Sequence, residues 1–207
     1  MFENKRVELE KKMQAEGRLP PGQSATIKFP ILHYGQTPET DLSTWTLRIF
    51  GLVERERTLS WEEFTALPTR EIVCDIHCVT RWSMFDTRWE GVSFKQIVNL
   101  AGVKPEAHFV ILHAEGGYTA NLPLEVMLED DVLLAYKYDG RLLDPDHGFP
   151  LRALVPQRYF WKSAKWLRGV EFTESDRPGF WERAGYHNDA NPWKEQRLAQ
   201  RSGWGLF

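Results

Sequence analysis

Residues 70–82 of this chain read REIVCDIHCVTRW, and this stretch decides the fold. Ile72, Cys74 and Ile76 alternate with charged or polar residues, which predicts a half-buried strand that ends at Cys78. The strand delivers a thiol into a loop with basic and aromatic neighbours, and positive neighbours favour the thiolate that soft metals bind. Because free cysteine is among the most buried residue types, this stretch alone leaves open whether Cys78 is a ligand or a core residue.

The rest of the chain alternates short strand patterns with short helix patterns. Strands are expected over residues 44–53, 108–113, 118–122, 132–138, 151–155 and 170–173. Capping boxes predict short helices that begin at Ser60 and Ser93, and a further small helix is expected over 123–128. Hairpins are expected around 86–90 and at the Asp-Gly pair of 139–140. Without βαβ regularity, the predicted fold class is α+β, with mixed and mainly antiparallel short strands.

Three segments divide the 207 residues. Residues 1–24 are expected to form a polar helix, over 3–16, followed by a proline-containing linker. Residues 25–173 are expected to form the main domain, of ordinary size for a single core. Residues 174–207 are polar, contain prolines and are rich in tryptophan, so we expect a tail that wraps the domain and could complete a functional site.

The bulk composition excludes several classes of protein. A net charge of -3 gives no reason to expect nucleic acid or an anionic membrane as partner. No apolar run approaches the roughly 20 residues of a membrane span, and the N-terminus has neither a signal core nor a twin arginine, so a cytoplasmic location is expected. The chain has no CxxC, HExxH, GxGxxG, phosphate-loop or GxSxG motif, which excludes zinc ribbons and the common hydrolase, kinase and dinucleotide-binding classes.

The two cysteines have separate explanations. Cys74 and Cys78 are four residues apart on a predicted strand, a span of about 13 Å. A disulfide needs its two Cα atoms within about 7 Å, so these residues do not pair. We expect Cys74 in the core.

A second informative stretch lies far downstream, at residues 152–168. It contains five bases and no acid: Arg152, Arg158, Lys162, Lys165 and Arg168. The preceding turn, DHGFP at 146–150, fixes where His147 and Arg152 point. Clustered bases with a histidine and a serine suit a phosphate or another oxyanion. A solvated basic face is the alternative, but the interleaved aromatic residues favour partial burial, and buried bases need a counter-anion.

Three segments together resemble the molybdopterin-binding domain of the sulfite oxidase family. They are HCVTRWS at 77–83, DHGFPLR at 146–152 and KSAKWL at 162–167. The chain is most similar to the short bacterial members, which contain this domain only, and the resemblance covers residues 25–190. It implies a mixed α+β fold and a molybdenum atom held by the dithiolene of one pterin and by one protein cysteine. It implies no haem.

The resemblance also assigns roles to individual residues. Cys78 would be the molybdenum ligand, and Arg81 and Tyr186 would orient the substrate as further catalytic residues. The residues implied to contact the cofactor, mainly its pterin and phosphate, are His33, Tyr34, Cys78, His113, His147, Arg152, Ser163 and Lys165.

The implied function is a molybdenum cofactor-dependent oxidoreductase. It would transfer an oxygen atom to or from a small substrate, a sulfite-like anion, with an unknown external electron donor or acceptor as partner. The spacing of Arg81 from Cys78 departs from that of the animal enzyme, which leaves sulfite specificity open. The alternatives are a sulfoxide reductase of the same family, a non-catalytic molybdopterin-binding protein, and a plain structural domain.

Overall fold

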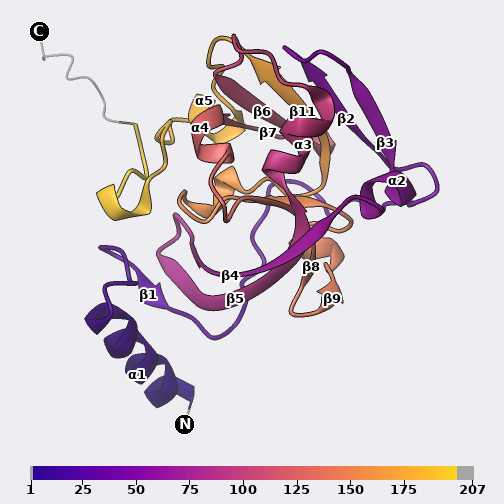
Figure 1. Cartoon of the computed structure of the whole chain (residues 1–207). Coiled ribbons are helices and arrows are strands. Elements are labelled where there is room, and N and C mark those ends of the chain that lie inside the picture. The colour runs from indigo at the N-terminus through magenta and orange to yellow at the C-terminus, as the bar shows by residue number, and fades with distance from the viewer. Residues whose placement is uncertain (1, 200–207) are drawn as a thin grey trace, which may run out of the picture.

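Two β-sheets with short helices around them form the fold in the computed structural model, which describes residues 2–199 (Figure 1). The strands are β1 Ser24–Ala25, β2 Thr46–Gly51, β3 Arg57–Ser60, β4 Thr69–His77, β5 Trp82–Ser93, β6 Phe109–Ala114, β7 Thr119–Pro123, β8 Leu133–Tyr138, β9 Arg141–Leu142, β10 Arg152–Leu154 and β11 Leu167–Thr173. The α-helices are α1 Phe2–Ala15, α2 Trp61–Thr65, α3 Phe94–Ala101, α4 Leu124–Met127 and α5 Phe180–Arg183.

The sheets are mixed and mainly antiparallel, which confirms the α+β prediction. Within residues 2–199 the first sheet has six strands in the order β1-β5-β8-β10, with β4 also on β5 and β9 also on β8. The second sheet has five strands in the order β3-β2-β11-β6-β7. Parallel pairing occurs between β1 and β5 and between β2 and β11, two pairs whose members are far apart in sequence.

The main core lies where the two sheets and α3 meet. Apolar residues alternate with polar ones along β2, so its buried side chains share one face. Members of this core include Leu47, Ile49, Val92, Phe94, Ile97, Val110, Leu112, Leu134, Val155 and Phe172. Burial of these side chains supplies most of the driving force for folding, at roughly 1.5–3 kcal/mol for each large apolar side chain.

Serine caps start two of the helices, as the sequence predicts. The capping box of α2 is complete: Glu63 N donates to Ser60 Oγ at 3.2 Å, and Ser60 N donates to Glu63 Oε2 at 2.8 Å. In α3, Ser93 Oγ accepts from Gln96 N, and Gly102 ends the helix with a positive φ of 65°.

The hairpin expected around residues 86–90 is wrong. The strand β5 continues through that region, and the chain instead reverses at Cys78: Cys78 N donates to Trp82 O at 2.8 Å, and Arg81 N donates to Cys78 O at 3.0 Å. Arg81 closes this three-residue loop with a φ of 73°, the left-handed conformation that such loops require. Asp86, the polar residue that suggested a turn, has a φ of 53° and lies at a register shift between β4 and β5. It marks a β-bulge and not a turn.

The N-terminal segment reaches the first sheet beside β1. Figure 1 shows α1 away from the two sheets, next to β1. Glu10 Oε2 accepts a hydrogen bond from Ala25 N, and the Arg18 guanidinium binds Asp75 and Asp86 on the β4–β5 hairpin. Among the described residues, the helices are all too short or too polar to cross a membrane. Residues 200–207 of the expected tail lie outside the described residues.

Candidate functional site

A cavity of about 470 Å³ gathers most of the predicted site residues. Its walls come from residues 29–38, 78–82, 115–118, 147–152, 160–166 and 180–186, and many of the lining side chains are aromatic. The predicted residues that line it are His33, Tyr34, Cys78, His147, Arg152, Ser163, Lys165 and Tyr186. Segments that are more than 100 residues apart in sequence therefore meet at one site.

Cys78 is buried at the tip of the β4–β5 hairpin, where it lines the cavity. Its Sγ lies 3.2 Å from Thr80 Oγ1, and its carbonyl oxygen accepts from Gln23 Nε2 at 3.0 Å. Burial raises the pKa of Cys78, so the protein's own residues favour the thiol over the thiolate. A bound cation would supply the positive charge that the thiolate needs.

The two basic neighbours of Cys78 in sequence do not contact its sulfur, contrary to our expectation. His77 is buried beside Ser83, with Nδ1 2.8 Å from Ser83 Oγ, and burial lowers its pKa to about 4. Arg81 is exposed and donates to Gly22 O at 3.4 Å. Because side chains alternate along a strand, His77 points away from Cys78, and the left-handed conformation turns Arg81 outward.

Arg152 is buried at the cavity and forms no ion pair within residues 2–199. Its guanidinium donates to three main-chain carbonyls: Ala153 O at 3.3 Å, His147 O at 2.8 Å and Ser163 O at 2.9 Å. Burial lowers the pKa of Arg152 to about 9, which still leaves it charged at neutral pH. Arg152 therefore lines the cavity without a carboxylate partner among the described residues, since Glu115, which also lines the cavity, pairs with Arg168.

Lys165 and His147 complete this positive end of the cavity. Lys165 Nζ donates to Asp146 O at 2.7 Å and to Leu32 O at 3.0 Å, and burial together with the charge of Arg152 lowers its pKa to about 7. His147 stacks on Phe29 with a centroid distance of 4.0 Å, and its Nε2 is buried without a hydrogen-bond partner among the described residues.

The other three bases of the 152–168 stretch have acidic partners. Lys162 Nζ lies 2.7 Å from Glu182 Oε1, Arg158 Nη2 lies 2.9 Å from Asp189 Oδ1, and Arg168 Nε lies 2.8 Å from Glu115 Oε1. These three ion pairs are structural. Of the five predicted anion-binding bases, only Arg152 and Lys165 line the cavity.

Ser163, His33 and Tyr34 line the cavity with different degrees of exposure. Ser163 is buried, and its Oγ accepts from Val155 N at 2.9 Å, which leaves its own hydroxyl hydrogen free to donate. His33 Nδ1 lies 3.1 Å from Gly35 O, and Tyr34 is exposed at the rim, with its ring 4.8 Å from that of Phe180.

His113 lies outside the cavity. It is on β6, and its Nε2 lies within hydrogen-bond distance, 2.8 Å, of Glu171 Oε2 on β11. The structure therefore gives no support to the predicted pterin contact of His113. Its position at the end of a strand is explained by this local pairing.

The C-terminal segment closes one side of the cavity with aromatic residues that sequence reasoning did not assign. Trp161 and Trp181 both pack on Tyr186, at centroid distances of 5.2 Å and 4.9 Å. The composition of the tail showed its tryptophans, but no periodic pattern indicated which of them face the site. No local sequence signal could have found them, because Glu182, the acid that anchors this wall, meets Lys162 only through tertiary packing.

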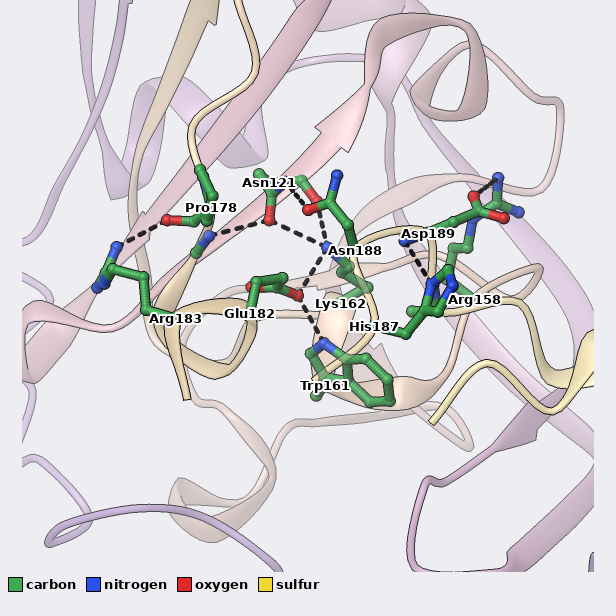
Figure 2. A network of polar contacts seen from close by, with 12 residues as sticks. Asn121, Arg158, Trp161, Lys162, Pro178, Glu182, Arg183, His187, Asn188 and Asp189 are labelled. Carbon is green, nitrogen blue, oxygen red and sulfur yellow. Dashed lines mark hydrogen bonds and ion pairs between the residues drawn. The ribbon is translucent and has the colours of Figure 1, made fainter. Parts of the chain in front are cut away.

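A buried polar network fixes this wall (Figure 2). Glu182 Oε1 accepts from Trp161 Nε1 at 2.8 Å and lies 2.7 Å from Lys162 Nζ. Lys162 also donates to the carbonyl and side-chain oxygens of Asn121, whose amide binds Asp176 and Asn188. The network ties α5, and with it Trp181, to the second sheet.

Comparison with known proteins agrees with this geometry. A family model described as the oxidoreductase molybdopterin binding domain matches residues 34–181. The chain is 52% identical over 183 residues to the uncharacterized oxidoreductase YuiH of Bacillus subtilis, covering 88% of this chain and 92% of that protein. It is 29% identical over 170 residues to a putative protein-methionine-sulfoxide reductase subunit of Azospira oryzae, covering 81% of this chain and 64% of that protein.

A solved structure has the same fold. The sulfane dehydrogenase SoxCD from Paracoccus pantotrophus matches with a TM-score of 0.65 at 22% identity, over 74% of this chain and 43% of that chain. The family model spans more than half of the residues, and the Bacillus relative is similar over nearly its whole length. The chain therefore belongs to the oxidoreductases with a molybdopterin-binding domain.

Proposed function

We propose that this oxidoreductase transfers an oxygen atom to or from a small, uncharged substrate such as a sulfoxide, with Cys78 as the molybdenum ligand. The observation that carries this proposal is the distribution of charge in the cavity. Arg152 and Lys165 contact residues of the 146–163 region, whereas the loop of Cys78 packs through Val79 in a cluster with the uncharged Trp181 and Tyr186. Arg81, the expected partner of an anionic substrate, does not line the cavity.

The residues present fit a molybdenum cofactor. Within residues 2–199 no group of three or more metal-ligating side chains exists, which suits a metal that takes one protein thiolate and its other ligands from an organic group. Among the described residues, neither the buried Arg152 nor the half-buried Lys165 has a carboxylate partner, and a bound phosphate would supply the missing negative charge. His147 Nε2 is a buried polar atom still without a partner.

The chain's own residues would bind, orient and shield the reacting groups. When bound, the cofactor supplies two-electron redox chemistry and oxygen-atom transfer. Arg152, Lys165, His147 and Ser163 would hold the phosphate, and His33 and Tyr34 would contact the pterin from the rim. Tyr186 would orient the substrate oxygen through its hydroxyl, while Trp161 and Trp181 exclude water from that side. Reduction of a sulfoxide would consume two protons and two electrons from an external donor, with a thioether and water as products.

The ligand assignment is tested by molybdenum analysis of the Cys78→Ser variant. We expect its molybdenum content to fall at least about tenfold, because a hydroxyl is a much poorer ligand for a soft metal. Cys74→Ser is the matched control: Cys74 lies on the same hairpin, half-buried beside Thr87, and does not line the cavity. Full molybdenum occupancy in Cys78→Ser would overturn the assignment.

The substrate class is tested by turnover in both directions. The purified, cofactor-loaded protein is assayed with a sulfoxide and a reduced dye, and separately with sulfite and an artificial electron acceptor. We expect turnover of the sulfoxide and little turnover of sulfite, because the bases of residues 2–199 that line the cavity, Arg152 and Lys165, bind carbonyls outside the Cys78 loop. If sulfite is turned over faster than the sulfoxide, the substrate is a sulfite-like anion. If neither compound is turned over, a non-catalytic binding protein is favoured.

A further inference from the structure

Arg197, a side chain of the C-terminal segment, hydrogen-bonds the loop of Cys78. Its Nη1 donates to Val79 O at 2.7 Å, across 118 residues of sequence. The guanidinium carbon lies 4.9 Å from the ring centroid of Tyr159, which is fully buried. The Arg197 side chain is only 12% exposed, so this is an inserted arginine and not a surface one.

The same guanidinium also holds the N-terminal linker. Arg197 Nη2 donates to Gly22 O at 3.2 Å and to Pro21 O at 3.4 Å. Gly22 has a φ of 66°, and a Cβ at this position would collide with Glu195 and press on Arg81 and Arg197. The absence of a side chain at Gly22 is what lets three segments of the chain meet here.

Two successive carbonyls of the hairpin loop are therefore held by side chains from outside the hairpin. Cys78 O accepts from Gln23 Nε2 of the linker, and Val79 O accepts from Arg197 of the C-terminal segment. The carbonyls of Cys78 and Val79 belong to the two peptide groups that follow the Cys78 Cα. Holding both groups in place restricts the backbone dihedral angles that set the direction of the Cys78 sulfur. A planar guanidinium can donate to two segments at once, which the single ammonium of lysine cannot do with the same geometry.

We propose that Arg197 is a positioning residue that fixes the direction of the Cys78 thiol toward the cavity and makes that direction depend on docking of the C-terminal segment. The proposal rests on the proposed role of Cys78 as metal ligand. It concerns a residue that does not line the cavity, although the backbone around it pairs with the segment of Tyr186: His187 N donates to Arg197 O at 3.2 Å.

The test compares Arg197→Met with Arg197→Lys in the full-length chain, made in a host that lacks the pterin. Arg183→Met is the matched control, because Arg183 is also in the C-terminal segment and also donates to a main-chain carbonyl, Pro178 O, but is exposed and forms that bond within its own segment. The measurements are hydrogen exchange of the peptide that spans residues 78–82 and the rate at which a maleimide modifies the Cys78 thiolate, taken from the plateau of the pH profile because the charge of Arg197 also favours that thiolate.

We expect both rates to rise about tenfold in Arg197→Met, to rise less in Arg197→Lys, and to stay at the wild-type value in Arg183→Met. In protein from a host that makes the cofactor, the electron paramagnetic resonance signal of molybdenum should also change in Arg197→Met. Unchanged loop exchange in Arg197→Met, or an equal change in Arg183→Met, would contradict the proposal.

If Arg197→Met fails to fold, Arg197→Lys decides: wild-type rates in that variant overturn the role of the guanidinium. Failure of the ligand assignment is seen separately, as molybdenum retained in Cys78→Ser, while loop exchange is measured without any metal. The two results can therefore be told apart.

Discussion

Two sets of bases in the stretch 152–168 look alike in sequence and differ in the structure. Lys162, Arg158 and Arg168 each lie within 3 Å of a carboxylate, whereas Arg152 and Lys165 donate only to main-chain carbonyls. The first set joins the C-terminal segment and the loop after β6 to the rest of the protein. The second set faces the cavity. The presence or absence of an acidic partner, and not the density of charge, separates the structural bases from the two that we propose to bind a phosphate.

The difference is energetic. A buried base with a carboxylate partner recovers part of its desolvation cost, and removing either partner leaves an uncompensated charge. A buried base without such a partner keeps its desolvation cost until an anion binds. Binding of the anion therefore stabilises the folded protein. Four substitutions or conditions test this contrast.

The largest effect is expected for Lys162→Met. It leaves Glu182 buried without its cation, and we expect the free energy of unfolding to fall by about 3–5 kcal/mol. Urea unfolding of the cofactor-free protein measures this. The double variant Lys162→Met, Glu182→Gln should recover part of the loss, and a single variant as stable as the wild type would show that the pair is not structural.

The next effect is expected for Lys165→Met. Loss of an unpaired cation at the cavity should lower the pterin and molybdenum content about tenfold, which corresponds to about 1.4 kcal/mol of binding free energy. The stability of the cofactor-free protein should stay the same or rise, because a desolvated charge is removed. A loss of stability with normal cofactor content would place Lys165 with the structural bases.

A smaller effect is expected from pH. Burial lowers the pKa of Lys165 from 10.5 to about 7 in the folded protein. Between these two values the unfolded chain binds more protons than the folded one, so the contribution of Lys165 to stability should rise with pH, by less than about 1 kcal/mol per pH unit. Urea unfolding of the cofactor-free protein at pH 7 and pH 9 measures the slope. Lys165→Met should reduce it, and an identical slope in both proteins would show that Lys165 is not its source.

The smallest effect is expected for Arg168→Met. Its pair with Glu115 is about one third exposed on both sides, so the loss should be less than about 1 kcal/mol of stability. Cofactor content, measured as molybdenum per chain, should not change. A marked fall in molybdenum would move Arg168 from the structural set to the binding set.

The sequence was sufficient to predict the local features of the site. The alternating pattern of β4 located Cys78 at a strand end, and the Gly-Phe-Pro turn located His147 and Arg152 beside one another. These features depend on side chains that are close in sequence, where strand alternation and turn chemistry act directly. The fold class followed from the same local patterns.

The features that could not be predicted depend on contacts between distant segments. Lys162 lies in η3, the 3₁₀ turn at Phe160–Lys162, and its partner is Glu182 in the C-terminal segment. The sequence could not predict this pair, because no periodic pattern links the two segments. The true hairpin was missed because Arg81 takes the left-handed position that glycine or asparagine usually signals. Tertiary packing decided both.

The contact between Arg197 and Val79 also has a consequence for the order in which the protein is made. A ribosome synthesises the hairpin of Cys78 118 residues before the arginine that holds it. The hairpin can pair and the first sheet can collapse while the chain is still growing, but the loop stays loosely held until the C-terminal segment emerges. We therefore expect the cofactor to be inserted after synthesis of the chain is complete, and chains truncated before residue 197 to fold most of their sheets yet to load the metal poorly.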